Sequence, residues 1–135
     1  MERRNLLFEC HGGPLVSGDA AAMTLALERI VGATGLTILG RQSHDFKPAG
    51  ATAALMLSES HLTAHSWPED GYVAIDLFTC SSASSDEKIV AAVREVFQPT
   101  RLEVRRVERF DVTIAAPNEA RADSLSGHAI ASKRE

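Results

Sequence analysis

The middle of the chain gathers side chains whose types suit nucleophilic and acid–base chemistry. It contains the stretch Ser58-Glu59-Ser60-His61-Leu62-Thr63-Ala64-His65-Ser66-Trp67-Pro68-Glu69 and, a little further on, Asp76-Leu77-Phe78-Thr79-Cys80. A hydroxyl can attack a neighbouring carbonyl, an imidazole titrates near neutral pH and can move protons, and a thiol can donate a proton. Ser60, His65 and Cys80 are therefore the candidate reactive residues.

Taken one by one, the same residues also have ordinary structural explanations. Ser60 would be a strand-edge serine, His65 a hydrogen-bonded core or interface histidine, and Cys80 a small buried apolar side chain. His61 and His65 have the spacing that would let two imidazoles share a metal ion on a helix. On a strand they lie roughly 13 Å apart. Because Pro68 and the β-rich surroundings favour a strand, no metal site is expected.

The candidate residues fall on predicted strands. Apolar and β-branched runs predict strands over residues 5–10, 36–40, 51–58, 60–66, 72–80 and 102–107, with 41–50 as a polar connection. The turn signal Trp67-Pro68-Glu69-Asp70-Gly71 separates the fourth strand from the fifth. Ser60 and His65 therefore share one predicted strand, and Cys80 ends the next.

Two helices are predicted from apolar residues at i, i+4, i+7 and i+8. The first covers about residues 19–32, with Ser17 or Asp19 as N-cap and Gly32 or Gly35 as its stop. The second opens with the capping box Ser84-Ser85-Asp86-Glu87 and ends before a proline. The order strand, helix, four strands, helix, strand favours an α+β two-layer sandwich: a mostly antiparallel sheet with both helices packed on one face.

Length and composition indicate one small globular domain. The chain has 135 residues, of which 44% are hydrophobic and 24% charged. Residues 1–116 are predicted to form the domain and 117–135 a flexible tail. A net charge of -4 without a basic stripe argues against nucleic acid as a partner. No apolar run approaches the roughly 20 residues that span a bilayer, and without an export signal a cytoplasmic protein with free thiols at Cys10 and Cys80 is expected.

The central stretch resembles, residue by residue, the prokaryotic-type S-adenosylmethionine decarboxylase proenzymes of the pyruvoyl-dependent decarboxylases. Their motif is Ser-Glu-Ser-His leading into His-Thr-Trp-Pro-Glu and then a strand that ends Asp-Leu-Phe-x-Cys. The resemblance implies self-cleavage between Glu59 and Ser60 into residues 1–59 and 60–135, with Ser60 becoming a pyruvoyl cofactor. It implies a Schiff base to the substrate, loss of CO₂ and a product that donates aminopropyl groups for spermidine synthesis.

The resemblance also implies roles for the surrounding residues. His65 resembles the proton acceptor of self-processing, and Cys80 resembles the donor that returns a proton to the substrate α-carbon. Phe46 stands where the family places an aromatic side chain against the adenine, and Glu69 where a carboxylate binds the ribose. Thr52 takes the place of a serine that supports processing.

Departures from the family pattern leave the substrate open. The chain reads Gly50-Ala51-Thr52-Ala53 where Gly-Val-Ser-Gly is usual, has Asp70 in place of a tyrosine, and has Ser81 after Cys80 in place of a glycine. An acidic Asp70 would suit a cationic substrate, so a pyruvoyl-dependent ornithine or arginine decarboxylase is an alternative. A second alternative is a non-catalytic binding or assembly module in which Ser60 never reacts.

The spacing of Ser60 and His65 bears on assembly. Residues five apart on a regular strand point to opposite faces. Either the strand bends near Ser60, or His65 of a second protomer completes the site. The resemblance implies sites shared at a dimer interface, so we expect a homodimer of cleaved protomers.

Overall fold

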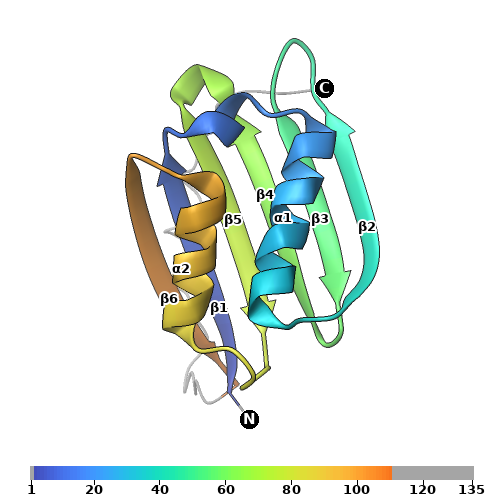
Figure 1. Ribbon diagram of the computed structural model, residues 1–135, viewed down its shortest axis with the longest axis vertical. Coiled ribbons are helices and arrows are strands. Elements are labelled where there is room, and N and C mark those ends of the chain that lie inside the picture. Colours follow the sequence, from blue (N-terminus) through green and yellow to red (C-terminus); the bar gives the residue numbers. More distant parts are fainter. Residues whose placement is uncertain (1, 111–135) are drawn as a thin grey trace, which may run out of the picture.

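The computed structural model describes residues 2–110, which form a six-stranded sheet with two α-helices against one face (Figure 1). The strands are β1 (Arg3–His11), β2 (Ile38–Asp45), β3 (Ala51–Leu57), β4 (Ser60–Trp67), β5 (Tyr72–Thr79) and β6 (Arg101–Arg109), and the helices are α1 (Ala20–Thr34) and α2 (Asp86–Phe97). All strand pairs are antiparallel, in the order β2-β3-β4-β5-β1-β6. The predicted α+β two-layer sandwich is confirmed. The predicted domain end at 116 and the tail 117–135 lie outside the described residues.

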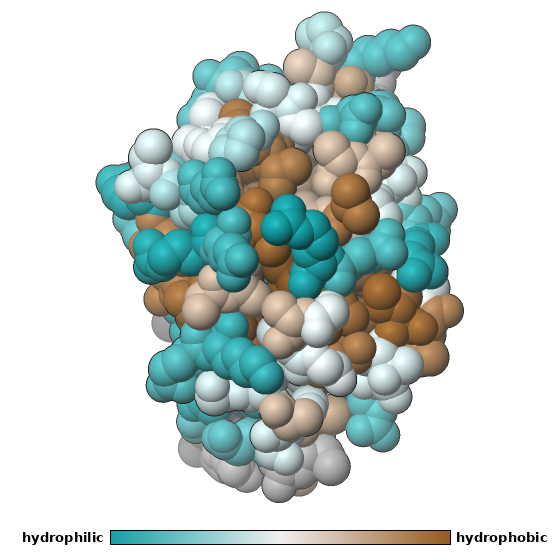
Figure 2. Space-filling view, in the orientation of Figure 1, coloured by the Kyte–Doolittle hydropathy of each residue, from teal (hydrophilic) through white to brown (hydrophobic). Residues whose placement is uncertain are grey.

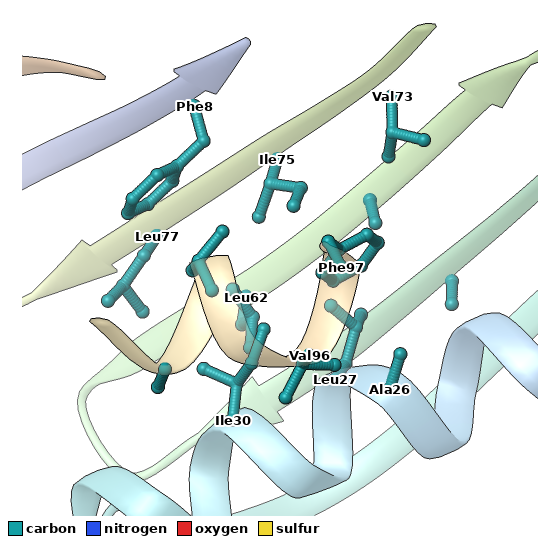
Figure 3. Packing of buried hydrophobic residues seen from close by; sticks show 14 of the residues in the cluster. Phe8, Ala26, Leu27, Ile30, Leu62, Val73, Ile75, Leu77, Val96 and Phe97 are labelled. Carbon is teal, nitrogen blue, oxygen red and sulfur yellow. The ribbon is translucent and has the colours of Figure 1, made fainter. Parts of the chain in front are cut away.

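Alternation along the strands explains why the helices cover only one face. Every second residue of β1 and β5 is buried, because these side chains pack under the helices. Figure 3 shows Phe8, Ile75 and Leu77 of the sheet together with Ile30 of α1 and Phe97 of α2. Each such buried side chain contributes about 1.5–3 kcal/mol to stability. We call the sheet surface that points away from α1 and α2 the back face.

Helix α1 begins and ends at two of the predicted capping residues. The Asp19 side chain accepts a hydrogen bond from the Ala22 N–H at 2.8 Å, so Asp19 and not Ser17 is the N-cap. Gly35 has a φ of 73° and ends the helix, which therefore runs past Gly32.

Helix α2 begins one residue later than the predicted capping box places it. The N-cap is Ser85, whose side chain accepts from the Lys88 N–H at 3.2 Å. Ser84 is buried and instead donates to the Thr34 carbonyl oxygen at 2.8 Å. The box built on Ser84 is wrong because that hydroxyl is used in packing the loop before α2 against the end of α1.

The edge strand β2 is longer and more polar than predicted. The expected strand over 36–40 followed by a connection is replaced by a strand from Ile38 to Asp45, most of whose residues are exposed. An edge strand with little burial carries no hydrophobic alternation, so its polar half is indistinguishable from a loop in the sequence.

The outer surface of the helix layer is mixed, with hydrophilic side chains over much of it and hydrophobic patches between them (Figure 2). Neither α1 nor α2, the two α-helices among residues 2–110, is long and apolar enough to cross a bilayer.

Candidate active site

The register of β4 and β5 brings Cys80 beside the predicted cleavage position. His61 of β4 pairs with Phe78 of the antiparallel strand β5. Glu59, two residues before His61, therefore faces Cys80, two residues after Phe78. The Cys80 thiol lies 3.5 Å from the Glu59 carbonyl oxygen and 3.4 Å from Glu59 Oε2. The carbonyl of the Glu59–Ser60 peptide is therefore in direct contact with a thiol.

The Glu59–Ser60 peptide lies in the tight turn between β3 and β4. Leu57 pairs with Ser60, which leaves Ser58 and Glu59 as the turn residues. Glu59 has a φ of 57°, a conformation that costs a non-glycine residue roughly 1–2 kcal/mol. The Ser60 hydroxyl donates to the Ser58 carbonyl oxygen at 3.4 Å. We call residues 58–60 together with Cys80 the cleavage turn.

A hollow of about 590 Å³ opens beside the cleavage turn. It is lined by residues 35–37 after α1, by the turn residues 58–59 and by residues 80–83 after β5. These three connections meet at the lower end of the sheet in Figure 1. The hollow is large enough for a small-molecule substrate.

Two further candidates meet on the back face. Thr52 of β3 and His65 of β4 are cross-strand partners, and Thr52 Oγ1 lies 2.8 Å from His65 Nδ1. Since one of these atoms must donate and the other accept, the hydrogen bond orients the imidazole. We call Thr52 and His65 the back-face pair.

Aromatic side chains continue the row beside His65. The Trp67 ring lies 6.2 Å from the His65 ring and stacks on Tyr72 at 5.7 Å. Burial, with a hydrogen bond to Glu9, raises the pKa of Tyr72 to about 12, so the phenol stays neutral at physiological pH. The imidazole of the back-face pair therefore lies beside an uncharged aromatic wall.

The cleavage turn and the back-face pair are separate within one chain. In β4, Leu62, Ala64 and Ser66 are buried under the helices, whereas His65 belongs to the alternate set on the back face. Ser60 shares the parity of Leu62, and five residues of strand separate it from His65 by roughly 17 Å. Ser60 and His65 of the same protomer are therefore not within contact distance.

The residues expected to bind the adenosyl group lie at the other end of the sheet. Phe46 follows β2 and packs edge-on against the His44 ring at 4.9 Å. Glu69 and Asp70 are exposed in the 3-10 turn Pro68–Asp70 between β4 and β5. In Figure 1 this turn is at the top and the cleavage turn is at the bottom. Phe46, Glu69 and Asp70 therefore lie at the same end of the sheet as Thr52 and His65.

One buried charge was missed by the sequence analysis. The Arg4 side chain on β1 is 5% exposed and points under the start of α2, toward the loop that follows Cys80. The signal was present, because Arg4 occupies a core-facing position in the alternation that continues with Leu6 and Phe8.

The second thiol of the chain, Cys10, is buried in the core. Burial raises the pKa of the Cys10 thiol to about 12, which keeps it protonated and unreactive. Among residues 2–110, no three His, Cys, Asp or Glu side chains are grouped as metal ligands would be.

Comparison with known proteins agrees with this fold and motif. The sequence pattern that describes S-adenosylmethionine decarboxylase matches residues 4–110. A chain from Clostridium botulinum strain Loch Maree, named S-adenosylmethionine decarboxylase proenzyme, is 38% identical over 103 residues, which cover 76% of this chain and 87% of that one. A proenzyme of the same name from Methanococcus aeolicus is 34% identical over 91 residues, covering 67% and 78%.

A solved structure agrees at the level of the fold. The crystal structure of the adenosylmethionine decarboxylase from Aquifex aeolicus superposes with a TM-score of 0.71 at 24% identity, and the match covers 87% of this chain and 98% of that one. The family resemblance predicted from residues 46–80 is thus confirmed over nearly all the described chain. The chain belongs to the S-adenosylmethionine decarboxylase family.

Proposed function

We propose that this chain is a self-processing, pyruvoyl-dependent S-adenosylmethionine decarboxylase that is cleaved between Glu59 and Ser60. The observation that carries the proposal is the contact between the Cys80 thiol and the carbonyl of the Glu59–Ser60 peptide. It joins the bond to be cut and the predicted proton donor in one place. The family match and the proenzyme relatives support this carboxy-lyase function over the basic amino acid decarboxylase and the binding module.

The cleavage turn supports the processing step. Attack by Ser60 Oγ on the Glu59 carbonyl carbon forms a C–O bond and breaks the C–N bond, and the freed amine takes the hydroxyl proton. Removal of the Ser60 α-proton then breaks the Cβ–O bond and releases the Glu59 carboxylate. Water replaces the nitrogen, which leaves as ammonia, and a pyruvoyl group remains at residue 60. The left-handed conformation of Glu59 supports this step, because breaking the peptide bond relieves it.

The residues around the turn fit a pyruvoyl group at position 60. Proenzymes of this family are in general pyruvoyl-dependent. The pyruvoyl carbonyl supplies an electron sink for the loss of CO₂ from a bound amine substrate. The contact of Cys80 with the same peptide supports its role as proton donor to the substrate α-carbon, and the adjoining hollow of about 590 Å³ offers space for a small-molecule substrate.

We also propose a homodimer in which each site combines the cleavage turn of one protomer with the back-face pair of the other. Support comes from the distance between Ser60 and His65 of one chain and from apolar side chains exposed on the back face. Met56 is 60% exposed and Val107 45%, and strand register places both on this face. A second sheet stacked on the back face would bury them.

A two-fold axis gives the remaining candidates their roles. When the axis lies between the two stacked back faces and runs perpendicular to the strands, the upper end of one sheet in Figure 1 lies over the lower end of the other. Phe46 and Glu69 of one protomer are then brought toward the cleavage turn of its partner. In this arrangement Phe46 stacks on the adenine and Glu69 accepts hydrogen bonds from the ribose.

Denaturing intact-protein mass spectrometry tests the proposed function. We expect two fragments that meet at Glu59/Ser60, and treatment with an amine and a reductant should add the amine's mass to the C-terminal fragment only. Decarboxylation assays with S-adenosylmethionine, ornithine and arginine then identify the substrate, with S-adenosylmethionine the expected one. A single uncut mass from folded protein would overturn the enzyme and favour the binding module.

A further inference from the structure

We propose that Arg4 of β1 is a positioning residue that holds the loop after Cys80 and so sets the place of the thiol at the cleavage turn. The proposal rests on the proposed function in treating Cys80 as the proton donor. Arg4 itself touches none of the reacting atoms. It acts through the backbone of residues 81–84.

The Arg4 guanidinium binds two carbonyl groups of one loop and the first residue of α2. Nη1 donates to the Ser81 carbonyl oxygen at 3.2 Å and Nη2 to the Ser84 carbonyl oxygen at 3.1 Å. Nε donates to Asp86 Oδ1 at 2.6 Å. A planar fork of five N–H donors can serve two carbonyls and a carboxylate at once, whereas a lysine ammonium is a single compact charge. The guanidinium therefore ties both ends of the loop, at Ser81 and Ser84, to β1.

A second contact holds the same loop from the other side. The buried Ser84 hydroxyl donates to the Thr34 carbonyl oxygen at the end of α1. Ser84 thus lies between α1 and the Arg4 guanidinium. Since Ser81 directly follows Cys80, the thiol has little freedom to move away from the Glu59 carbonyl. A misplacement of about 1 Å can cost on the order of 10²-fold in rate.

Arg106 of β6 offers a matched control. Its Nε donates to the other oxygen of Asp86 at 2.7 Å, and its remaining contacts go to Glu2 and Glu108. Arg106 therefore shares the carboxylate with Arg4, whereas the loop carbonyls of Ser81 and Ser84 accept from Arg4. If the loss of a contact with Asp86 were what mattered, replacing either arginine should have the same effect. If Arg4 positions Cys80 through the loop, only the replacement of Arg4 should change the behaviour of Cys80.

The first measurement is the alkylation rate of Cys80 by iodoacetamide in the full chain carrying Ser60→Ala, followed by peptide mass spectrometry. Cys10 is fully buried and serves as the internal reference. Because a released loop opens more often, Arg4→Lys should raise the Cys80 rate roughly tenfold. Arg106→Lys should leave it within about twofold of the parent chain. Equal rates in the two variants would overturn the proposal.

The second measurement uses the cleavable chain. Arg4→Lys should still cleave, but its kcat should fall roughly tenfold with KM little changed, because proton transfer and not binding is impaired. Arg106→Lys should keep both constants. If the parent chain neither cleaves nor turns over, the proposed function fails while the alkylation rates still test Arg4. If both Arg4→Lys and Arg4→Gln fail to fold by circular dichroism, Arg4 serves stability and the positioning role is wrong.

Discussion

The cleavage turn and the back-face pair differ in almost every physical respect. The turn has a left-handed Glu59, long contacts of 3.4 to 3.5 Å and solvent on one side. The back-face pair lies within regular strands and has a hydrogen bond of 2.8 Å between Thr52 and His65. The bond proposed to be cut thus lies in an exposed turn, and the groups proposed to move protons lie on regular strands.

In the proposed homodimer, each site takes the cleavage turn from one copy of the chain and the back-face pair from the other. In the proposed mechanism the turn holds the groups that are consumed or reprotonated, and the back-face pair holds an oriented imidazole about 17 Å away along β4. Variants at the two regions should therefore fail differently. The following changes test that difference.

Ser60→Ala has the largest expected effect. Without the hydroxyl no ester forms, so we expect complete loss of cleavage and of decarboxylation. Intact mass spectrometry should show one uncut chain. A variant that is cleaved and active would remove Ser60 from the mechanism.

Cys80→Ala should separate processing from turnover within the cleavage turn. Cleavage should continue at least in part, because the attacking group remains, while turnover should fall by on the order of 10²–10⁴ with the loss of the proton donor. Fragment masses and CO₂ release from labelled substrate measure the two steps. Full turnover would show that the thiol contact with Glu59 has no catalytic use.

Co-expression of two processing-defective chains tests whether the regions act in trans. Ser60→Ala lacks the nucleophile and His65→Ala lacks the imidazole, but their mixed dimer has one complete composite site. Random pairing should then cleave about half of the His65→Ala chains. Mass spectrometry distinguishes these fragments by the substitution. Cleavage no greater than in His65→Ala alone would place both residues' action within one protomer.

Thr52 offers a smaller and more local test of the back-face pair. Thr52→Val keeps the shape but removes the hydrogen bond to His65, which should slow cleavage about 2- to 10-fold. Thr52→Ser keeps the hydroxyl and should cleave near the parent rate. The time course of fragment formation gives both rates, and equal rates for the two variants would mean that the hydrogen bond does not assist processing.

The smallest expected effect concerns Cys10, which is buried in the core, whereas Cys80 lies at the cleavage turn. The protonation of Cys10 should affect only how stability depends on pH. Burial raises the pKa of Cys10 from its usual 9.0 to about 12, so between these pH values the folded state binds more protons than the unfolded state. The free energy of unfolding should therefore fall as pH rises, by up to about 1.4 kcal/mol per pH unit for this group. Urea titrations at several pH values give the free energy of unfolding as a function of pH. This free energy should fall less steeply with pH in Cys10→Ala than in the parent chain. An equal dependence on pH would contradict the raised pKa of Cys10.

Much of the fold was predictable because the signals are local. Apolar and β-branched runs located all or part of each strand among residues 2–110, a period of 3.6 located both α-helices, and Asp19 and Gly35 were among the predicted caps. The exceptions are the polar half of β2 and the N-cap of α2. An edge strand needs no hydrophobic alternation, and Ser84 is taken by a hydrogen bond to Thr34, fifty residues away in the sequence.

The order of residue types along the chain was enough to single out Ser60, His65 and Cys80 as candidates and to indicate that Ser60 and His65 point to opposite faces, as the alternation along β4 shows. The sequence did not predict which residues these side chains and their supporting groups contact. The contact of Cys80 with Glu59, the bond of Thr52 to His65 and the hold of Arg4 on the loop all join segments distant in sequence. Such contacts depend on strand register and loop packing, which are set by the assembled core and not by local periodicity.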